Sequence, residues 1–170
     1  MSTAANLSMN DIVIRQAGVD DCSAILMMLS QLAGELGDSD RFSCRIEDIR
    51  DHGFGDHSLF QCLIASRDGE DLGLALYFPV FSTTRGKPGV YLQDLWVSPT
   101  CRDYGVGLRL LQQVAHCAEQ QWQACYLDLM VHGHNTGAER FYRRHGFVGH
   151  SQDQHLFLEG EAFRSLQHEI

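Results

Sequence analysis

The chain has 170 residues, 44% of them hydrophobic, which favours one domain with a substantial core. It carries 22 acidic and 13 basic side chains, and the formal net charge of −9 argues against nucleic acid and favours a cationic small molecule as partner. No apolar run approaches the roughly 20 residues that cross a bilayer, so we expect no membrane partner. The six cysteines lack any Cys-x-x-Cys pair, which predicts free thiols and a cytoplasmic protein. We expect a flexible N-terminus over residues 1–10 and a single domain over 11–170.

Hydrophobic periodicity predicts a first half made of a strand, two helices and three strands. Asp20 is the expected N-cap of the first helix, and Asp68-Gly69 is typical of a tight hairpin between strands. In chain order, the expected elements are a strand over 11–16, a helix from Asp20 to Gly34 or Gly37, a second helix, and strands over 59–66, 72–81 and 90–97. The second helix is expected to start after Ser43, to bury Ile46 and Ile49, and to stop at Gly53. Consecutive strands with short connections predict an antiparallel meander.

The second half alternates helices and strands. The expected elements are a helix from Gly107 to Gln120, a strand over 125–131, a helix that opens on the capping-box spacing of Thr136 and Glu139 and ends at Gly146, and a final strand over 156–158. A helix between two strands implies a parallel crossover pair. The fold class predicted is therefore mixed α/β.

The turn between the strand over 90–97 and the following helix carries the pattern Arg102-x-x-Gly105-x-Gly107. Backbone N–H groups and a helix N-terminus that converge in this way can bind an anion. By itself the pattern is equally explained by a tight turn. The chain has no Gly-x-x-x-x-Gly-Lys-Ser/Thr motif and no correctly spaced dinucleotide fingerprint, so a phosphate-bearing cofactor other than ATP or NAD is indicated.

A second motif makes the pattern specific. Asn135, Ala138, Phe141 and Tyr142 precede Arg143-Arg144-His145-Gly146-Phe147 on the helix after the capping box. Together with the upstream glycine motif, this resembles the GNAT superfamily of acetyl-CoA-dependent N-acyltransferases over residues 12–163. The segment from Asp51 to His57, containing Gly-Phe-Gly-x-His, and Tyr91-Leu92-Gln93-Asp94 resemble its diamine (spermidine/spermine) and thialysine N-acetyltransferase branch. The resemblance implies a mostly antiparallel twisted sheet flanked by helices on both faces, and a homodimer.

The resemblance also implies an acetyl-CoA site. Backbone groups of Leu95 and Val97 would hold the pantetheine arm, the loop after the strand would cradle the pyrophosphate, and Arg102 would add charge, unless it is a solvated loop arginine. Asn135 would hold the cofactor arm, cap its helix, or do both. The expected cofactor-binding residues are Leu95, Val97, Arg102, Asp103, Tyr104, Gly105, Val106, Gly107, Asn135 and Arg144.

The family position of the acid that protonates the leaving thiolate is occupied by Tyr142, which could alternatively be a packing partner of Phe141. The branch carries an acidic pair on the central strand, and here the pair is Gln93-Asp94. Glutamine accepts a hydrogen bond but takes no proton, so Asp94 or ordered water must carry more of the deprotonation, provided that Asp94 faces the site. Gln93 and Asp94 are therefore expected to be both catalytic and substrate-binding.

Acidic residues after the first helix are a further expectation. Glu35 stands where the branch has substrate-facing acids, as do Asp38 and Asp40, although an acidic solvated loop has the same composition. His132-Gly133-His134 lacks a recognisable third ligand, so no metal is predicted.

These residues predict an enzyme that transfers acetyl directly from acetyl-CoA to a primary amine of a small molecule, such as a polyamine, thialysine or a related amino-acid amine. Loss of one acid at Gln93 favours a small zwitterionic amine over a long polycation. Two alternatives stay open: a non-catalytic acyl-CoA-binding module that has lost its base, and an acetyltransferase for a protein amine.

Overall fold

The computed structural model describes residues 11–149, 156 and 158–168, and they form two compact units, one ending at His132 and one beginning at Gly133. The elements of the first unit are β1 (Val13–Gln16), α1 (Cys22–Leu36), α2 (Ile46–Gly53), β2 (Gln61–Arg67), β3 (Glu70–Ser82), β4 (Lys87–Val97), α3 (Val106–Trp122) and β5 (Leu127–Asp128). The second unit contains α4 (Thr136–Arg144) and α5 (Gly160–His168). The single-domain expectation stays a prediction, and the N-terminal residues 1–10 lie outside the described part.

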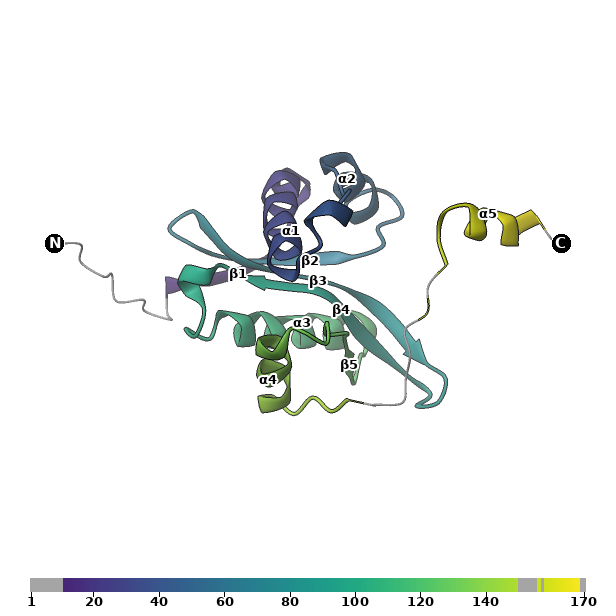
Figure 1. The fold of residues 1–170 in the computed structure, drawn as a ribbon. Coiled ribbons are helices and arrows are strands. Elements are labelled where there is room, and N and C mark those ends of the chain that lie inside the picture. Colours follow the sequence, from purple (N-terminus) through teal and green to yellow (C-terminus); the bar gives the residue numbers. More distant parts are fainter. Residues whose placement is uncertain (1–10, 150–155, 157, 169–170) are drawn as a thin grey trace. The chain divides into compact units, whose positions relative to one another are not determined.

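The strands of the first unit form one sheet in the order β1-β2-β3-β4-β5 (Figure 1). β1 to β4 pair antiparallel, and β4 pairs with β5 in parallel, which confirms the mixed sheet and its meander. The β2–β3 hairpin turns at Asp68 and Gly69, both with positive φ (51° and 82°), as expected for a two-residue hairpin loop.

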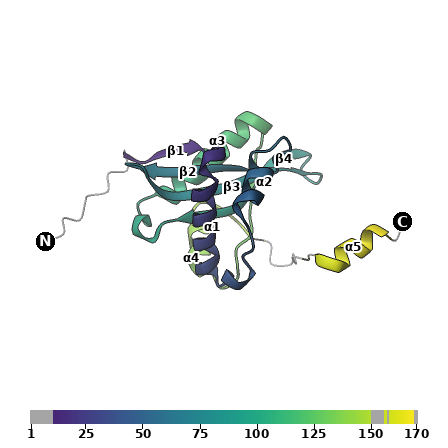
Figure 2. The same cartoon turned by 90° about the horizontal axis from the view of Figure 1, so that it is seen from above.

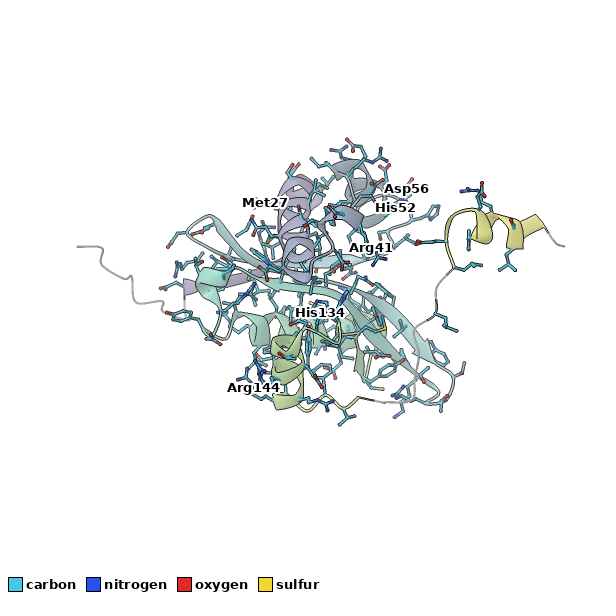
Figure 3. The ribbon with its side chains drawn as sticks, in the orientation of Figure 1. Met27, Arg41, His52, Asp56, His134 and Arg144 are labelled. Carbon is cyan, nitrogen blue, oxygen red and sulfur yellow. The ribbon has the colours of Figure 1, made fainter. Side chains whose placement is uncertain are left out.

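Helices cover both faces of this sheet: α1 and α2 lie on one face and α3 on the other (Figure 1). Seen from above, α1 runs across the strands (Figure 2). Ile25 and Met28 of α1 are fully buried against the sheet, whereas Met27 on the outer side of the helix is exposed (Figure 3). Each such buried side chain contributes about 1.5–3 kcal/mol to folding. None of the helices in the described ranges is long and apolar enough to span a membrane.

A β-bulge interrupts β4 at its centre. Leu76 of β3 pairs with Asp94 and the next residue, Tyr77, pairs with Leu92, so Gln93 is an extra residue without an opposite partner. Leu76 belongs to the core under α1, whereas the Tyr77 ring contacts Trp122 of α3 on the other face. Residues two apart in a regular strand share a face, but here the bulge puts Leu92 on the α3 face and Asp94 on the α1 and α2 face.

Several local expectations need correction. α1 begins at Cys22 without a side-chain cap from Asp20, because a 3-10 turn over Val19–Asp21 precedes it. The capping box at Thr136 is also wrong: Asn135 is the N-cap of α4, and its side-chain oxygen accepts a hydrogen bond from the Ala138 N–H at 3.1 Å. That bond spans the three residues that an N-cap side chain can reach.

The C-terminal strands differ most from expectation. The strand predicted over 125–131 pairs only at Leu127 and Asp128, because its ladder with β4 stops at Tyr91, two residues before the bulge. Phe157, in the middle of the predicted last strand, lies outside the described residues, and its neighbours Leu156 and Leu158 belong to no strand. The structure instead contains α5, which the sequence analysis does not predict.

Candidate functional site

The segment between β4 and α3 has the backbone of an anion site. We call residues 98–105 the phosphate loop, after the phosphate binding predicted for it. It contains a 3-10 turn over Pro99–Cys101 and two left-handed residues, Asp103 (φ 65°) and Gly105 (φ 76°). Positive φ is uncommon for a non-glycine residue such as Asp103, so the loop conformation is held against a local backbone preference.

The N-terminus of α3 lacks the groups that usually neutralise a helix start. Gly105 is its N-cap, no side chain caps it, and its first turn has no acidic residue. The N–H groups of that turn therefore retain hydrogen-bonding capacity and the partial positive charge of the helix dipole. Left-handed residues beside a helix start also gather N–H groups into a concave nest. These features fit a pyrophosphate, the group predicted to bind the N–H groups along Cys101 to Leu108.

The end of β4 offers backbone groups beside this loop. The β4–β5 ladder stops at Tyr91, so within the described residues no strand covers that edge of β4 near Leu95 and Val97. An uncovered strand edge can hydrogen-bond a ligand. The Val97 carbonyl, however, already accepts a hydrogen bond from Arg102 Nε at 3.0 Å.

Arg102 and Glu35, predicted in two different roles, contact each other. Arg102 Nη2 lies 2.5 Å from Glu35 Oε2, and Trp96 Nε1 donates to Glu35 Oε1 at 3.1 Å. The indole is almost wholly buried between α1 and the sheet, so its N–H needs this acceptor. The Glu35 carboxylate thus links α1, the end of β4 and the phosphate loop.

Asp94 occupies the α1 and α2 face in a row with Leu76 and Cys62 of the neighbouring strands. Burial raises the pKa of Asp94 from 3.8 to about 6. Burial first, and the Asp94 charge second, raise the pKa of the Cys62 thiol to about 12, which makes this core thiol inert as a nucleophile. Asp94 is therefore a poorly solvated carboxyl group able to exchange a proton near neutral pH. Gln93, at the bulge, is exposed.

The acidic residues after α1 have basic neighbours. Asp38 lies 3.5 Å from Arg41 and 3.9 Å from His132, while Asp40 is exposed. Arg41, His52 and Asp56 all belong to the segments on the α1 and α2 side of the sheet (Figure 3). This side thus mixes both charges. No cluster of three potential metal ligands forms among the residues that the structure describes.

The remaining predicted site residues belong to the second unit. Tyr142 is half-buried in an aromatic cluster, with ring centroids 5.2 Å from Phe141 and 5.3 Å from Phe147. Asn135 caps α4, as described above, and Arg144 in its last turn is exposed. Arg143 pairs with Glu139 at 2.8 Å, whereas His134 and Arg144 flank the two ends of α4 (Figure 3).

Sequence reasoning missed Trp96 as a site residue. Trp96 lies two positions after Asp94 on β4, and residues two apart in a strand share a face. Strand alternation could therefore have indicated that Trp96 lies on the same face as Asp94. Glu35 carried a signal for its other partner, Arg102, because a carboxylate in the last turn of a helix opposes the helix dipole and is stabilised by a positive partner.

Comparisons with known proteins identify the family of the chain. Residues 26–147 match the model of the Acetyltransferase (GNAT) family. Thialysine N-epsilon-acetyltransferase of Sus scrofa is 32% identical over 93% of this chain and 98% of its own. Spermidine/spermine N(1)-acetyltransferase-like protein 1 of Homo sapiens is 29% identical over 88% of this chain and 23% of its own.

Solved structures share the fold. An integron cassette protein from the mobile metagenome of V. cholerae has a TM-score of 0.77 at 22% identity, covering 94% of this chain and 99% of its own. An aminoglycoside acetyltransferase from an uncultured soil metagenomic sample, in complex with sisomicin, has a TM-score of 0.73 at 14% identity, covering 88% of this chain and 97% of its own. The family match over most of the chain and the near full-length relatives lead to one conclusion: the chain belongs to the GNAT acetyltransferase family and is an N-acetyltransferase.

Proposed function

We propose that this N-acetyltransferase uses acetyl-CoA to acetylate a primary amine of a small amino acid of the thialysine class. The observation that carries the proposal is Asp94, a poorly solvated carboxyl group that the bulge turns to the α1 and α2 face. The near full-length relative named for thialysine acetylation supports the substrate class. Gln93 supports it as well, because it replaces one residue of the acidic pair found in the branch. A site with less negative charge suits a zwitterion better than a long polycation.

Acetyl-CoA would supply the acetyl group as a thioester. The N–H groups along Cys101 to Leu108 would bind its pyrophosphate, and the uncovered edge of β4 at Leu95 and Val97 would bind its pantetheine arm. Asn135 and Arg144 are also proposed as cofactor-binding residues. The net charge of −9 makes such local N–H donors necessary, because the protein as a whole repels a polyanion.

Asp94 is proposed as the proton acceptor for the substrate. A lysine-like ammonium has a pKa of about 10.4, so moving its proton to a carboxylate with the ordinary value of 3.8 costs about 9 kcal/mol. Burial raises the Asp94 pKa to about 6 and reduces that cost to about 6 kcal/mol. Burial of Asp94 thus lowers the free-energy cost of the proton transfer by roughly 3 kcal/mol.

Two further side chains complete the proposed chemistry. Gln93 accepts a hydrogen bond from the ammonium or orients a water between it and Asp94. As the amine nitrogen bonds to the acetyl carbon, the carbon–sulfur bond would break and the second proton of the nitrogen would pass to the departing sulfur. Tyr142 would donate a hydrogen bond from its hydroxyl to the developing thiolate. An unperturbed tyrosine is less acidic than a thiol, so this hydrogen bond, rather than complete proton transfer, is the proposed role.

The substrate proposal is tested by thiol release from acetyl-CoA with thialysine, lysine, ornithine, spermidine and spermine as separate substrates. The expected result is a higher kcat/KM for thialysine than for spermine. Equal or better use of spermine would contradict the amino-acid class, and no release with any amine would contradict the proposed reaction.

We also propose that the enzyme is a cytoplasmic homodimer. The six cysteines are all free, which suits a reducing compartment, and the family resemblance supports the dimer. Light scattering after gel filtration tests the assembly: a monomer mass at micromolar concentration would contradict it.

A further inference from the structure

Glu35 occupies an electrostatically unfavourable place in α1. It lies in the last turn of the helix, where the dipole disfavours negative charge, and no basic residue of that turn offsets it. Its two oxygens are instead engaged outside the helix, one by the Trp96 indole at 3.1 Å and one by Arg102 at 2.5 Å. The carboxylate is therefore compensated from β4 and the phosphate loop.

Arg102 connects these contacts to the loop backbone. Its Nε donates to the Val97 carbonyl at 3.0 Å while Nη2 binds Glu35, so the guanidinium bridges the end of β4 and α1. Both side chains of the pair remain partly exposed, at 44% for Arg102 and 38% for Glu35. The buried indole of Trp96 fixes the other carboxylate oxygen, which reduces the freedom that an isolated surface pair retains.

We propose that Glu35 is a positioning residue for the phosphate loop, acting through Arg102, and that it is not a ligand of the amine. This inference rests on the proposed use of acetyl-CoA. An anion nest works only when its N–H groups already point inward, and this loop holds Asp103 in a left-handed conformation to do so. Anchoring Arg102 to α1 orders the loop before the cofactor arrives, which removes an ordering cost from binding.

The decisive variant is Glu35→Gln. The amide oxygen still accepts from Trp96 Nε1, but the negative partner of Arg102 is lost. We expect faster amide hydrogen exchange over residues 98–105 in the cofactor-free protein and an acetyl-CoA Kd about tenfold higher by calorimetry. The control is R15Q, which breaks the Arg15–Asp21 ion pair, whose arginine is as exposed (43%) as Arg102 (44%), and should change neither quantity.

A double-mutant cycle with R102Q tests whether Glu35 acts through Arg102. If Glu35 acts through Arg102, Glu35→Gln has almost no further effect on exchange or Kd in the R102Q background. Arg102→Lys gives a second test in a variant that keeps the charge, because one ammonium cannot replace the fork that binds both Val97 and Glu35. It should loosen the loop as R102Q does.

Unchanged loop exchange in Glu35→Gln would overturn the proposal. So would a variant whose only defect is a higher KM for the amine, since that is the signature of a direct amine ligand. Failure of the proposed function looks different: the wild type would bind no acetyl-CoA, while the exchange data would still decide whether Glu35 orders the loop.

Discussion

Replacing Asp94 with Asn is expected to make the protein more stable and much less active. Asn has nearly the shape of Asp and can hydrogen-bond, but it carries no charge and takes no proton. The β4 bulge places Asp94 where its charged form is poorly solvated, which costs folding free energy. The substitution removes the charge and with it this cost.

The stability effect follows from the raised pKa. The folded protein keeps the Asp94 proton up to about pH 6, whereas the unfolded chain releases it near 3.8. The folded state thus binds more protons in this window, and its stability falls as pH rises through it. Above pH 6 the charged form costs at most about 3 kcal/mol. We expect Asp94→Asn to raise the Tm at pH 7.5 by several degrees, at about 2–4 °C per kcal/mol for a chain of this size, and to leave it unchanged near pH 4.

The activity effect has the opposite sign. Loss of a general base typically lowers the rate by about 10²–10⁴-fold. The wild-type kcat/KM for thialysine should fall below about pH 6, as Asp94 becomes protonated, and the variant should lack that acidic limb. Initial rates of thiol release across the pH range, together with thermal unfolding at two pH values, measure both effects.

Asp128→Asn is the matched control, because Asp128 is an exposed carboxylate on the neighbouring strand whose oxygen bonds the Leu129 N–H, as an amide oxygen also can. It should change neither stability nor rate appreciably. If Asp94→Asn is no more stable than this control and its rate is within threefold of wild type, the assignment of Asp94 as a desolvated base is refuted.

Three further predictions test separate parts of the structure. Tyr142→Phe should lower kcat at least tenfold with an unchanged acetyl-CoA Kd, and an unchanged kcat would remove the hydroxyl from the chemistry. Asn135→Ala should lose about 1 kcal/mol of stability with the cap of α4, while Asn135→Ser keeps the cap; weaker acetyl-CoA binding in both variants would assign the amide to the cofactor, and normal binding in the Ser variant would leave it a cap alone. Gly89→Ala should cost about 1–3 kcal/mol because its Cβ would overlap the Tyr126 ring, whereas Gly133→Ala, with nothing near the added Cβ, should be neutral in the same unfolding assay.

The order of elements followed from periodicity and turn residues. Ile46 and Ile49 placed α2 correctly, and Asp68-Gly69 placed the β2–β3 hairpin, because these signals depend on residues close in sequence. The bulge at Gln93 could not be predicted in this way. It depends on how β4 pairs with β3, and only that pairing shows which face Asp94 takes.

The candidate site shows the same division. The glycine motif was sufficient to predict the turn before α3, since such a turn is a local feature, whereas phosphate binding there stays a prediction. The contact between Glu35 and Arg102 joins residues 67 positions apart, so two side chains predicted to bind different ligands were not recognised as partners. The short length of β5 could not be predicted from the alternation over 125–131 either. It depends on the pairing with β4, which ends at Tyr91.

The most direct test of the proposed reaction is mass spectrometry of a mixture of the wild-type protein, acetyl-CoA and thialysine. We expect N-acetylated thialysine and CoA in equal amounts, with no acetyl group retained on the protein. Bound acetyl-CoA that yields no acetylated thialysine, or acetyl transfer to the protein alone, would contradict it.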